Sequence, residues 1–152
     1  MSTFEEILEK DGRLVNKTRG ISMEPMLRQN RDIVVIGAKT DRLKPYDVAF
    51  YKRGRNYVLH RVIKVEDWGY LIRGDNTYSL ERVPEAAVLG VLTHFSRKGK
   101  EYSVEDPAYQ RYARIWHKIY PVRFFLKRIC WKTKRILKKM GVKRPKWLKR
   151  RR

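Results

Sequence analysis

The sequence predicts a mainly β domain of short antiparallel strands, preceded by a short helix and followed by a basic helical appendage. Three observations carry this prediction: strand-like segments follow one another closely, no helical pattern separates them, and the apolar residues adopt a helical period from Pro107 onward. Closely spaced strands without intervening helices favour an antiparallel sheet over a parallel α/β fold. We therefore expect one domain over residues 1–106 and a helical appendage over residues 107–152.

The first element is a short helix. Thr3 stands three residues before Glu6, which is the spacing of a capping box, and Gly12 is placed to end the helix. β-branched and aromatic segments, separated by Gly, Pro, Asn or Asp, then predict strands. These strands cover residues 32–36, 47–52, 57–66 and 70–73, and a final hairpin over 88–95 and 101–104 turns across Lys98-Gly99-Lys100.

The appendage is predicted to be helical because its apolar residues recur at helical spacing while Lys and Arg occupy the other face. Pro121 is expected to break this helix. Residues 143–152 are too charged and too poor in apolar partners to fold alone, so we expect them to form a mobile tail. The apolar stripe comprises Tyr112, Ile115, Trp116 and Ile119 before the break and Val122, Leu126, Ile129, Ile136 and Met140 after it.

The positive charge of the chain is concentrated in this appendage. The whole sequence holds 37 Lys and Arg against 16 Asp and Glu, a net charge of +21. Residues 1–106 hold 19 of the basic residues and all 16 acids, so their net charge is +3, whereas residues 107–152 hold the other 18 basic residues and no acid. An anionic partner is therefore expected for the appendage.

Several classes of protein are disfavoured by composition. A single cysteine, Cys130, cannot form an intrachain disulfide, and three histidines are too few for structural zinc clusters, so we expect neither a metal nor a cofactor. No segment approaches the roughly 20 apolar residues that span a bilayer. The acidic start of the chain also differs from a secretory signal. We therefore expect a cytoplasmic protein that touches a membrane at most from its surface.

Three residues of catalytic type lie in separate segments. Ser22 lies in a loop between the expected helix and the first strand, and Asp75 lies in the turn Gly74-Asp75-Asn76. His60 lies within a strand, on a face that it shares with apolar residues two positions away on each side. Taken singly, these are an ordinary loop serine, a buried histidine and a turn. Together they supply a nucleophile, a base and a carboxylate that can orient the base.

The order and spacing of five segments resemble the signal peptidase I superfamily of serine peptidases, which includes the self-cleaving repressor-type peptidases. These segments are residues 22–27 (SMEPML), 32–36 (DIVVI), 47–51 (DVAFY), 60–63 (HRVI) and 74–76 (GDN). The resemblance covers about residues 18–92. Histidine at position 60 resembles the archaeal and endoplasmic-reticulum type of these enzymes, in which histidine replaces a lysine base.

This resemblance implies that Ser22 is the nucleophile, His60 the general base and Asp75 the acid that orients or charges the site. It also implies a coiled, mostly β fold with strands around a shallow, extended peptide groove. Two positions differ from the family pattern. Gly20 stands where the family often has a serine that helps to bind the oxyanion, so we expect this task to fall to the Ser22 backbone N–H, alone or with neighbouring N–H groups. Glu81 stands at a second acidic position, and the sequence assigns it no role.

The sequence thus favours a serine endopeptidase that cleaves a peptide or leader segment. The main alternative is a catalytically idle binding protein of the same fold, whose tail binds a membrane surface or nucleic acid. For the tail we rank an interfacial membrane helix first, packing on the β domain second and nucleic acid third. The aromatic residues that suggest a membrane interface are Trp116, Tyr120, Phe124, Phe125, Trp131 and Trp147.

Overall fold

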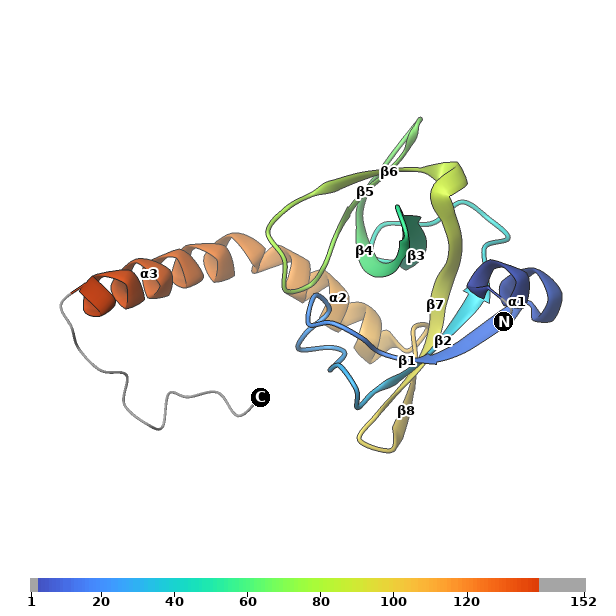
Figure 1. Ribbon diagram of the computed structural model, residues 1–152, viewed down its shortest axis with the longest axis horizontal. Helices are drawn as coiled ribbons and strands as arrows, with labels where there is room; N and C mark the ends of the chain where they lie inside the picture. Colours follow the sequence, from blue (N-terminus) through green and yellow to red (C-terminus); the bar gives the residue numbers. More distant parts are fainter. Residues whose placement is uncertain (1–2, 140–152) are drawn as a thin grey trace. The chain divides into compact units, whose positions relative to one another are not determined.

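The computed structural model describes residues 3–139, which divide into two compact units after His117. The first unit holds an eight-stranded sheet, and the described part of the second is one long helix (Figure 1). The strands are β1 (Arg13–Lys17), β2 (Ile33–Ala38), β3 (Val48–Arg53), β4 (Asn56–Glu66), β5 (Gly69–Arg73), β6 (Glu81–Pro84), β7 (Val88–Arg97) and β8 (Lys100–Ser103). The helices are α1 (Phe4–Asp11), the short 3-10 helix η1 (Glu85–Ala87), α2 (Pro107–Lys118) and α3 (Tyr120–Lys139).

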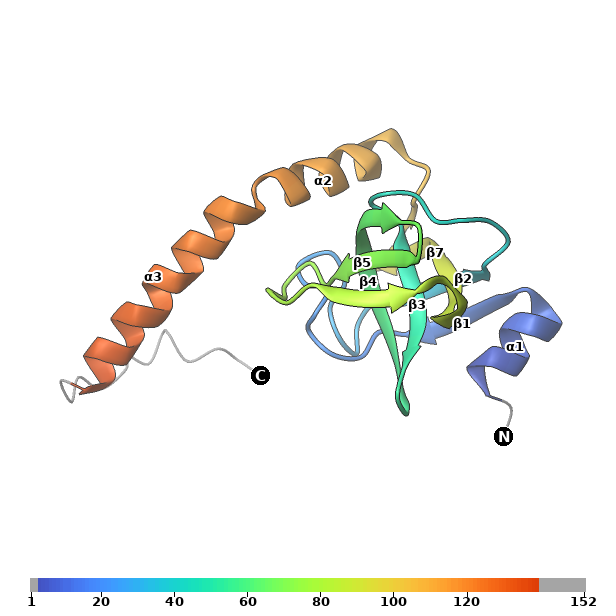
Figure 2. The same cartoon turned by 90° about the horizontal axis from the view of Figure 1, so that it is seen from above.

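All strand pairings are antiparallel, and the strand order is β1-β2-β7-β3-β4-β5-β6. The long strand β7 organises the sheet, because β2 pairs along one of its edges while β3 and then β8 pair along the other. Figure 2 shows β3, β4 and β5 side by side in this order. The sequence prediction of an antiparallel sheet is therefore confirmed.

The fold class differs from the prediction in two respects. The chain is mixed α/β rather than mainly β, because two C-terminal helices accompany the sheet and the short N-terminal helix. The sheet is also neither closed nor strongly curled, whereas the family resemblance implies a coiled one. Its path ends at β1 and β6, which pair with β2 and β5 respectively and not with each other.

The predicted strands are all present, but β1 and β6 were not predicted. β1 is an edge strand in which only Leu14 is fully buried. Such a strand does not need a run of apolar residues, and its sequence has none. β6 has four residues, and only Val83 among them is buried. Short strands at sheet edges carry too little apolar periodicity to stand out in a sequence.

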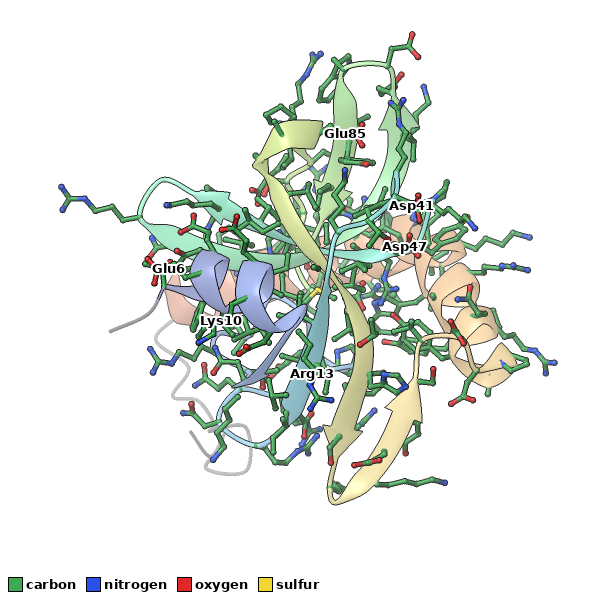
Figure 3. All side chains as sticks on the ribbon, turned by 90° about the vertical axis from the view of Figure 1, so that its right-hand side faces the viewer. Glu6, Lys10, Arg13, Asp41, Asp47 and Glu85 are labelled. Atoms are coloured by element: carbon green, nitrogen blue, oxygen red, sulfur yellow. The ribbon has the colours of Figure 1, made fainter. Side chains whose placement is uncertain are left out.

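The N-terminal helix forms as predicted. Glu6 N–H donates to Thr3 Oγ1 at 3.2 Å and Thr3 N–H donates to the Glu6 carboxylate at 3.0 Å, which completes the capping box. Gly12 ends α1 with a φ of 67°, a conformation that glycine adopts without strain. Figure 3 shows Glu6 and Lys10 on this helix. Phe4 lies beside Tyr57, with ring centroids 5.0 Å apart, and so anchors α1 to β4.

Apolar residues pack on both faces of β3, which explains why four of its residues in succession are buried. Val48 and Phe50 belong to a cluster that includes α1 and the loop before β2, whereas Ala49 and Tyr51 belong to a second cluster with β5 and β6. Successive strand residues point to opposite faces, so a single strand serves both clusters. The two clusters position the elements that carry the candidate site.

Helix α2 lies with the sheet in the first compact unit, which extends to His117. Tyr109 and Ala113 are buried, and the Tyr109 ring lies 5.7 Å from that of Phe95 on β7. Of the apolar stripe predicted for the appendage, Tyr112 packs against the core and Trp116 bonds to Asp75. Ile115 and Ile119 of the same stripe are exposed. The contacts of Tyr112 and Trp116 correspond to the intramolecular packing that sequence analysis ranks second.

Helix α3 forms the described part of the second unit. It begins at Tyr120, so Pro121 lies in its first turn, where proline is tolerated, and the helix break falls just before it at Ile119. Within residues 3–139, no helix combines the length and apolar composition needed to cross a bilayer. The predicted mobile tail over residues 143–152, with Trp147, lies outside the described residues.

Candidate active site

A groove of the sheet unit contains two of the three predicted catalytic residues. Its volume is about 670 Å³, and Ser22, His60 and Glu81 all contribute to its lining. Its apolar lining comes from α1, the Ser22 loop and strands β2 to β4, and comprises Phe4, Met23, Leu27, Val34, Ile36, Phe50, Val58 and Leu59. The volume lies within the range of roughly 300–1,000 Å³ that is usual for ligand-binding clefts.

The loop that carries Ser22 is fastened at its base by Thr18 and Asp32. Thr18 N–H donates to the Asp32 carbonyl at 2.9 Å, and Thr18 Oγ1 donates to the carbonyl of Arg28 at 2.7 Å. The buried Asp32 carboxylate accepts the Arg28 N–H at 2.8 Å. The loop is filled by Met23, Met26 and Leu27, whose side chains belong to the core. Its ends are therefore joined and its interior packed, which fixes the position of half-buried Ser22.

The turn after β5 holds the backbone on either side of Ser22. Asn76 N–H donates to the Ser22 carbonyl at 2.7 Å, and the Asn76 side-chain amide donates to the Ile21 carbonyl at 3.0 Å. A methyl group on Gly74 would lie 2.8 Å from the Ser22 carbonyl oxygen and 3.0 Å from His60 Nε2. Glycine is thus required at position 74 because the serine loop and the imidazole both approach it closely. His60 Nε2 therefore faces the place where the serine loop crosses the turn.

The other nitrogen of His60 faces a carboxylate and a phenol. His60 Nδ1 lies 3.3 Å from Glu81 Oε1 and 3.2 Å from Tyr51 Oη, and Tyr51 O–H donates to Glu81 Oε2 at 2.8 Å. Because a phenol has one proton and Tyr51 gives it to Glu81, Nδ1 must be the donor toward Tyr51 and Glu81. The proton on Nδ1 leaves Nε2 with a free lone pair. The imidazole is thus in the tautomer that accepts a proton from the serine side.

Burial and charge set the protonation states of this group. Burial lowers the pKa of His60 below its usual 6.5, and the opposing effect of the Glu81 carboxylate does not fully restore it. Burial would raise the pKa of Glu81, but hydrogen bonds from Tyr51 and Arg53 outweigh it and hold that pKa below the usual range. Burial and the neighbouring Glu81 raise the pKa of Tyr51. At neutral pH the group therefore contains a neutral base and an ionised carboxylate.

Asp75 lies in a different environment, although it follows Gly74 directly. Its two carboxylate oxygens accept hydrogen bonds from Arg61 Nε and Nη2, each at 2.8 Å, and both side chains are buried. Arg61 is adjacent to His60 on β4 and points to the other face of the sheet. The carboxylate in contact with His60 Nδ1 is that of Glu81. Asp75 as a catalytic acid stays a prediction, whereas its pairing with Arg61 is a structural fact.

Arg61 connects several segments in addition to Asp75. It donates to the Tyr46 carbonyl at 2.9 Å and to the Tyr109 hydroxyl of α2 at 3.1 Å, and it contacts Met26 Sδ of the serine loop at 3.2 Å. Trp116, which follows Tyr109 further along α2, donates from Nε1 to the Asp75 carbonyl at 3.3 Å. Helix α2 therefore supports the turn that holds the serine loop.

The structure thus brings Ser22 and His60 into one groove and adds Glu81, to which the sequence assigned no role. Within residues 3–139, no hydrogen bond joins Ser22 Oγ to His60. Sequence reasoning missed Arg61 and Tyr51. A charged residue within an apolar strand, next to a candidate base, was the available signal for Arg61. Tyr51 gave no such signal, because tyrosine is common in strands.

No group of three or more His, Cys, Asp or Glu side chains within the described part of the chain is arranged to hold a metal ion. Comparison with models of known protein families finds no match for this chain, and comparison with curated proteins finds none either. The resemblance to signal peptidases therefore depends on the residues and motifs themselves.

Because the Arg61–Asp75 pair is buried, removing Arg61 alone should strongly destabilise the fold, and removing Asp75 as well should restore part of the stability. Replacing Arg61→Met leaves the buried Asp75 carboxylate without its cation and should lower the free energy of unfolding by about 3–5 kcal/mol. The double variant R61M/D75L, which removes both charges, should recover a large part of that loss. Urea unfolding followed by circular dichroism measures these values.

An exposed ion pair provides the control for this cycle. Lys64 pairs with Glu66 at 2.8 Å with 65% of its side chain exposed, and Lys64→Met should therefore cost less than about 1 kcal/mol. The buried pair does not have the role assigned to it if R61M and K64M lower the free energy of unfolding equally. The same holds if adding D75L to R61M lowers that free energy further instead of restoring part of it.

Proposed function

We propose that this chain is a serine endopeptidase of the signal peptidase I type, with Ser22 as nucleophile and His60 as general base. The observation that carries the proposal is the position of the His60 ring, whose Nδ1 meets the Glu81 carboxylate while Nε2 faces the serine loop in the same groove. A neutral imidazole held in this way is the general base of a serine hydrolase. The support lies in chemistry and geometry, together with the motif order.

In the proposed mechanism, Ser22 Oγ attacks the scissile carbonyl as His60 Nε2 takes its proton. Glu81 holds the Nδ1 proton and stabilises the imidazolium that forms, which is the role the sequence gave to Asp75. His60 then returns the proton to the leaving amine, and water hydrolyses the acyl-enzyme by the same route. Asp75 acts indirectly, because its pairing with Arg61 fixes the turn that holds the serine loop.

The Ser22 backbone N–H is the proposed donor to the oxyanion. Among the residues that the structure describes, it has no hydrogen-bond acceptor, so it is free to bind a developing negative charge. Gly20 has a φ of 78° and contributes no side chain at the position where the family often has a serine. The oxyanion site would therefore be built from backbone groups.

The nucleophile is tested by Ser22→Ala, with Ser79→Ala as the matched control. Ser79 also lines the groove but contacts neither His60 nor Glu81 in the hydrogen-bond network. S22A should lower kcat for peptide cleavage by about 10⁴-fold or more, because no acyl-enzyme can form, while S79A should stay close to the unmodified chain. Covalent labelling by a serine-directed phosphonate, located by mass spectrometry, should follow the same pattern. Activity that survives in S22A would exclude Ser22 as the nucleophile and favour the idle binding protein.

The pH dependence tests the base and its partner. Cleavage requires neutral His60, and burial lowers the pKa of this residue below 6.5, so kcat/KM should rise with pH on a limb centred below 6.5 and level off by neutral pH. Glu81→Gln removes a negative charge that raises the pKa, so the limb should move to lower pH. Because the neutral amide no longer stabilises the imidazolium and its NH2 group can favour the wrong tautomer, kcat should also fall by roughly 10²–10⁴-fold.

Two results would contradict these roles for His60 and Glu81. One is an unchanged rate and pH limb in E81Q, which would return the orienting role to Asp75. The other is a limb centred well above 6.5 in the unmodified chain, since that would indicate a base other than a buried histidine.

A second proposed function, attachment to an anionic membrane surface, is favoured by helix α3. Its 20 residues include eight Lys and Arg and no acid. Five apolar side chains that recur at helical spacing are between 43% and 63% exposed: Val122, Phe125, Leu126, Ile129 and Ile136. An apolar face flanked by cations is suited to the interface of anionic lipid. Nucleic acid would use the cations but not this apolar face.

Four aromatic residues expected at the membrane are not part of this face. Tyr120 and Phe124 each stand two residues from Val122 and therefore lie on the opposite side of the helix. Trp116 belongs to α2 and is bonded to Asp75 in the sheet unit. Trp131 is 78% exposed but follows Val122 by nine residues, which places it on the opposite side of the helix. The proposed membrane contact is therefore made by the aliphatic residues and Phe125.

Vesicle sedimentation tests this attachment. The full chain should bind vesicles that contain phosphatidylglycerol and not pure phosphatidylcholine, and a chain ended after Ile119 should lose binding while keeping α2 and a folded sheet. Raising salt from 0.1 M to 1 M shortens the screening length from about 10 Å to about 3 Å and should weaken binding without abolishing it, because salt does not screen apolar insertion. F125S/I129S should reduce the residual binding at high salt, whereas W131S should not. Complete loss at high salt would indicate contact through charge alone and would exclude insertion.

A further inference from the structure

Two separate segments that line the active-site groove carry positive charge. Lys17 and Arg19 line it from the end of β1 and the start of the serine loop. Arg53 and Arg55 line it from the end of β3 and the turn into β4. Glu81 is the one acidic residue in the described lining, and Arg53 Nη1 pairs with it at 2.9 Å. The charge of that acid is therefore already compensated.

The remaining three basic side chains are exposed and lack acidic partners. Lys17, Arg19 and Arg55 form no ion pair with any residue from 3 to 139. Elsewhere on the sheet unit, several basic residues pair with acids, as in the pairs Lys52–Glu5 and Lys39–Glu85 at 2.8 Å and 2.9 Å. Residues 1–106 have a net charge of +3, which equals the four basic residues of the lining less Glu81, so the remaining 15 basic and 15 acidic residues of this segment balance. Charges of one sign around a cleft raise the local concentration of oppositely charged ligands.

From this arrangement we propose that the groove selects an acidic peptide, with Asp or Glu on both sides of a short apolar centre. The inference rests on the proposed function, since it names the substrate class of the same site. The apolar floor, which includes Met23, Leu27 and Phe50, suits the centre of such a peptide. Carboxylates on either side of that centre would meet the cations that these two segments contribute. A peptide with Lys or Arg in those places would instead meet like charges.

The probes for this proposal are three synthetic peptides of equal length. They share an alanine-rich centre with one photoreactive benzoylphenylalanine, and their flanks carry Glu, Gln or Lys. Each is irradiated with the full-length Ser22→Ala chain, and mass spectrometry locates the cross-links. Cross-links to groove residues are counted separately from those to residues 118–152, because the basic helix α3 also attracts the acidic peptide. Use of S22A makes the result independent of catalysis.

The Glu peptide should cross-link to the groove at least about fivefold more than the Gln peptide, and the Lys peptide least of all. This preference should shrink as salt rises. Adding Lys17→Glu should reduce groove cross-linking of the Glu peptide by about fivefold. Arg13→Glu, on the same strand but outside the groove lining, changes the net charge equally and should alter the yield by less than about twofold (Figure 3).

Equal groove yields for the Glu and Gln peptides would overturn the proposal, as would equal losses from K17E and R13E or the absence of any groove cross-link. The two proposals can fail separately. If S22A selects the Glu peptide but the unmodified chain cleaves none of the peptides and its serine is not labelled, the acidic preference stands and the peptidase proposal is rejected. Cleavage of all three peptides at equal rates, with Ser22 labelled, would support the peptidase and reject the acidic preference.

Discussion

The buried ion pair between Arg61 and Asp75 is the interaction on which the candidate site depends. Arg61 comes from the middle of the sheet, and its guanidinium meets the turn after β5, the serine loop, the segment before β3 and helix α2. Removing two charges from water is costly and is offset only when geometry is good and the remaining donors are bonded. Here four different segments supply acceptors, so the pair is satisfied only when all four are in place. Correct assembly of the site is therefore coupled to the folding of the domain.

The alternation of a β-strand explains how one strand can serve both structure and chemistry. His60 and Arg61 are neighbours in sequence, and their side chains leave β4 on opposite faces. His60 faces Tyr51 and Glu81, and Arg61 faces Asp75 and Tyr109. Both side chains reach toward the same turn, His60 at Gly74 and Arg61 at Asp75. A shift of register by one residue would exchange the two faces and place the arginine in the groove.

The sequence was informative where a local pattern reflects a local cause. The capping box of α1, the alternating strands and the serine and glycine-turn motifs each follow from a few adjacent residues, and each element is present where it was expected. Which carboxylate contacts His60 could not be predicted from adjacent residues. Asp75 and Glu81 both lie near the turn in sequence, and only the packing of β6 against β5 brings Glu81 to His60 while Arg61 engages Asp75. Likewise, the burial of Tyr109 that joins α2 to the sheet depends on contacts with distant strands.

Charge is distributed in this chain according to exposure. In the interior Arg61 is balanced by Asp75, and at the edge of the groove Arg53 is balanced by Glu81, because an uncompensated charge in a weakly polar environment is costly. On the exposed groove rim and along α3, basic residues outnumber acids without such a cost. The two surfaces differ in what accompanies the charge. The groove places cations around an apolar floor that ends at a serine and a base, which suits a short segment of chain. Helix α3 presents a continuous apolar face flanked by cations, which suits an extended anionic surface. Under the two proposals, the same electrostatic attraction would draw an acidic peptide to the groove and an anionic membrane to helix α3.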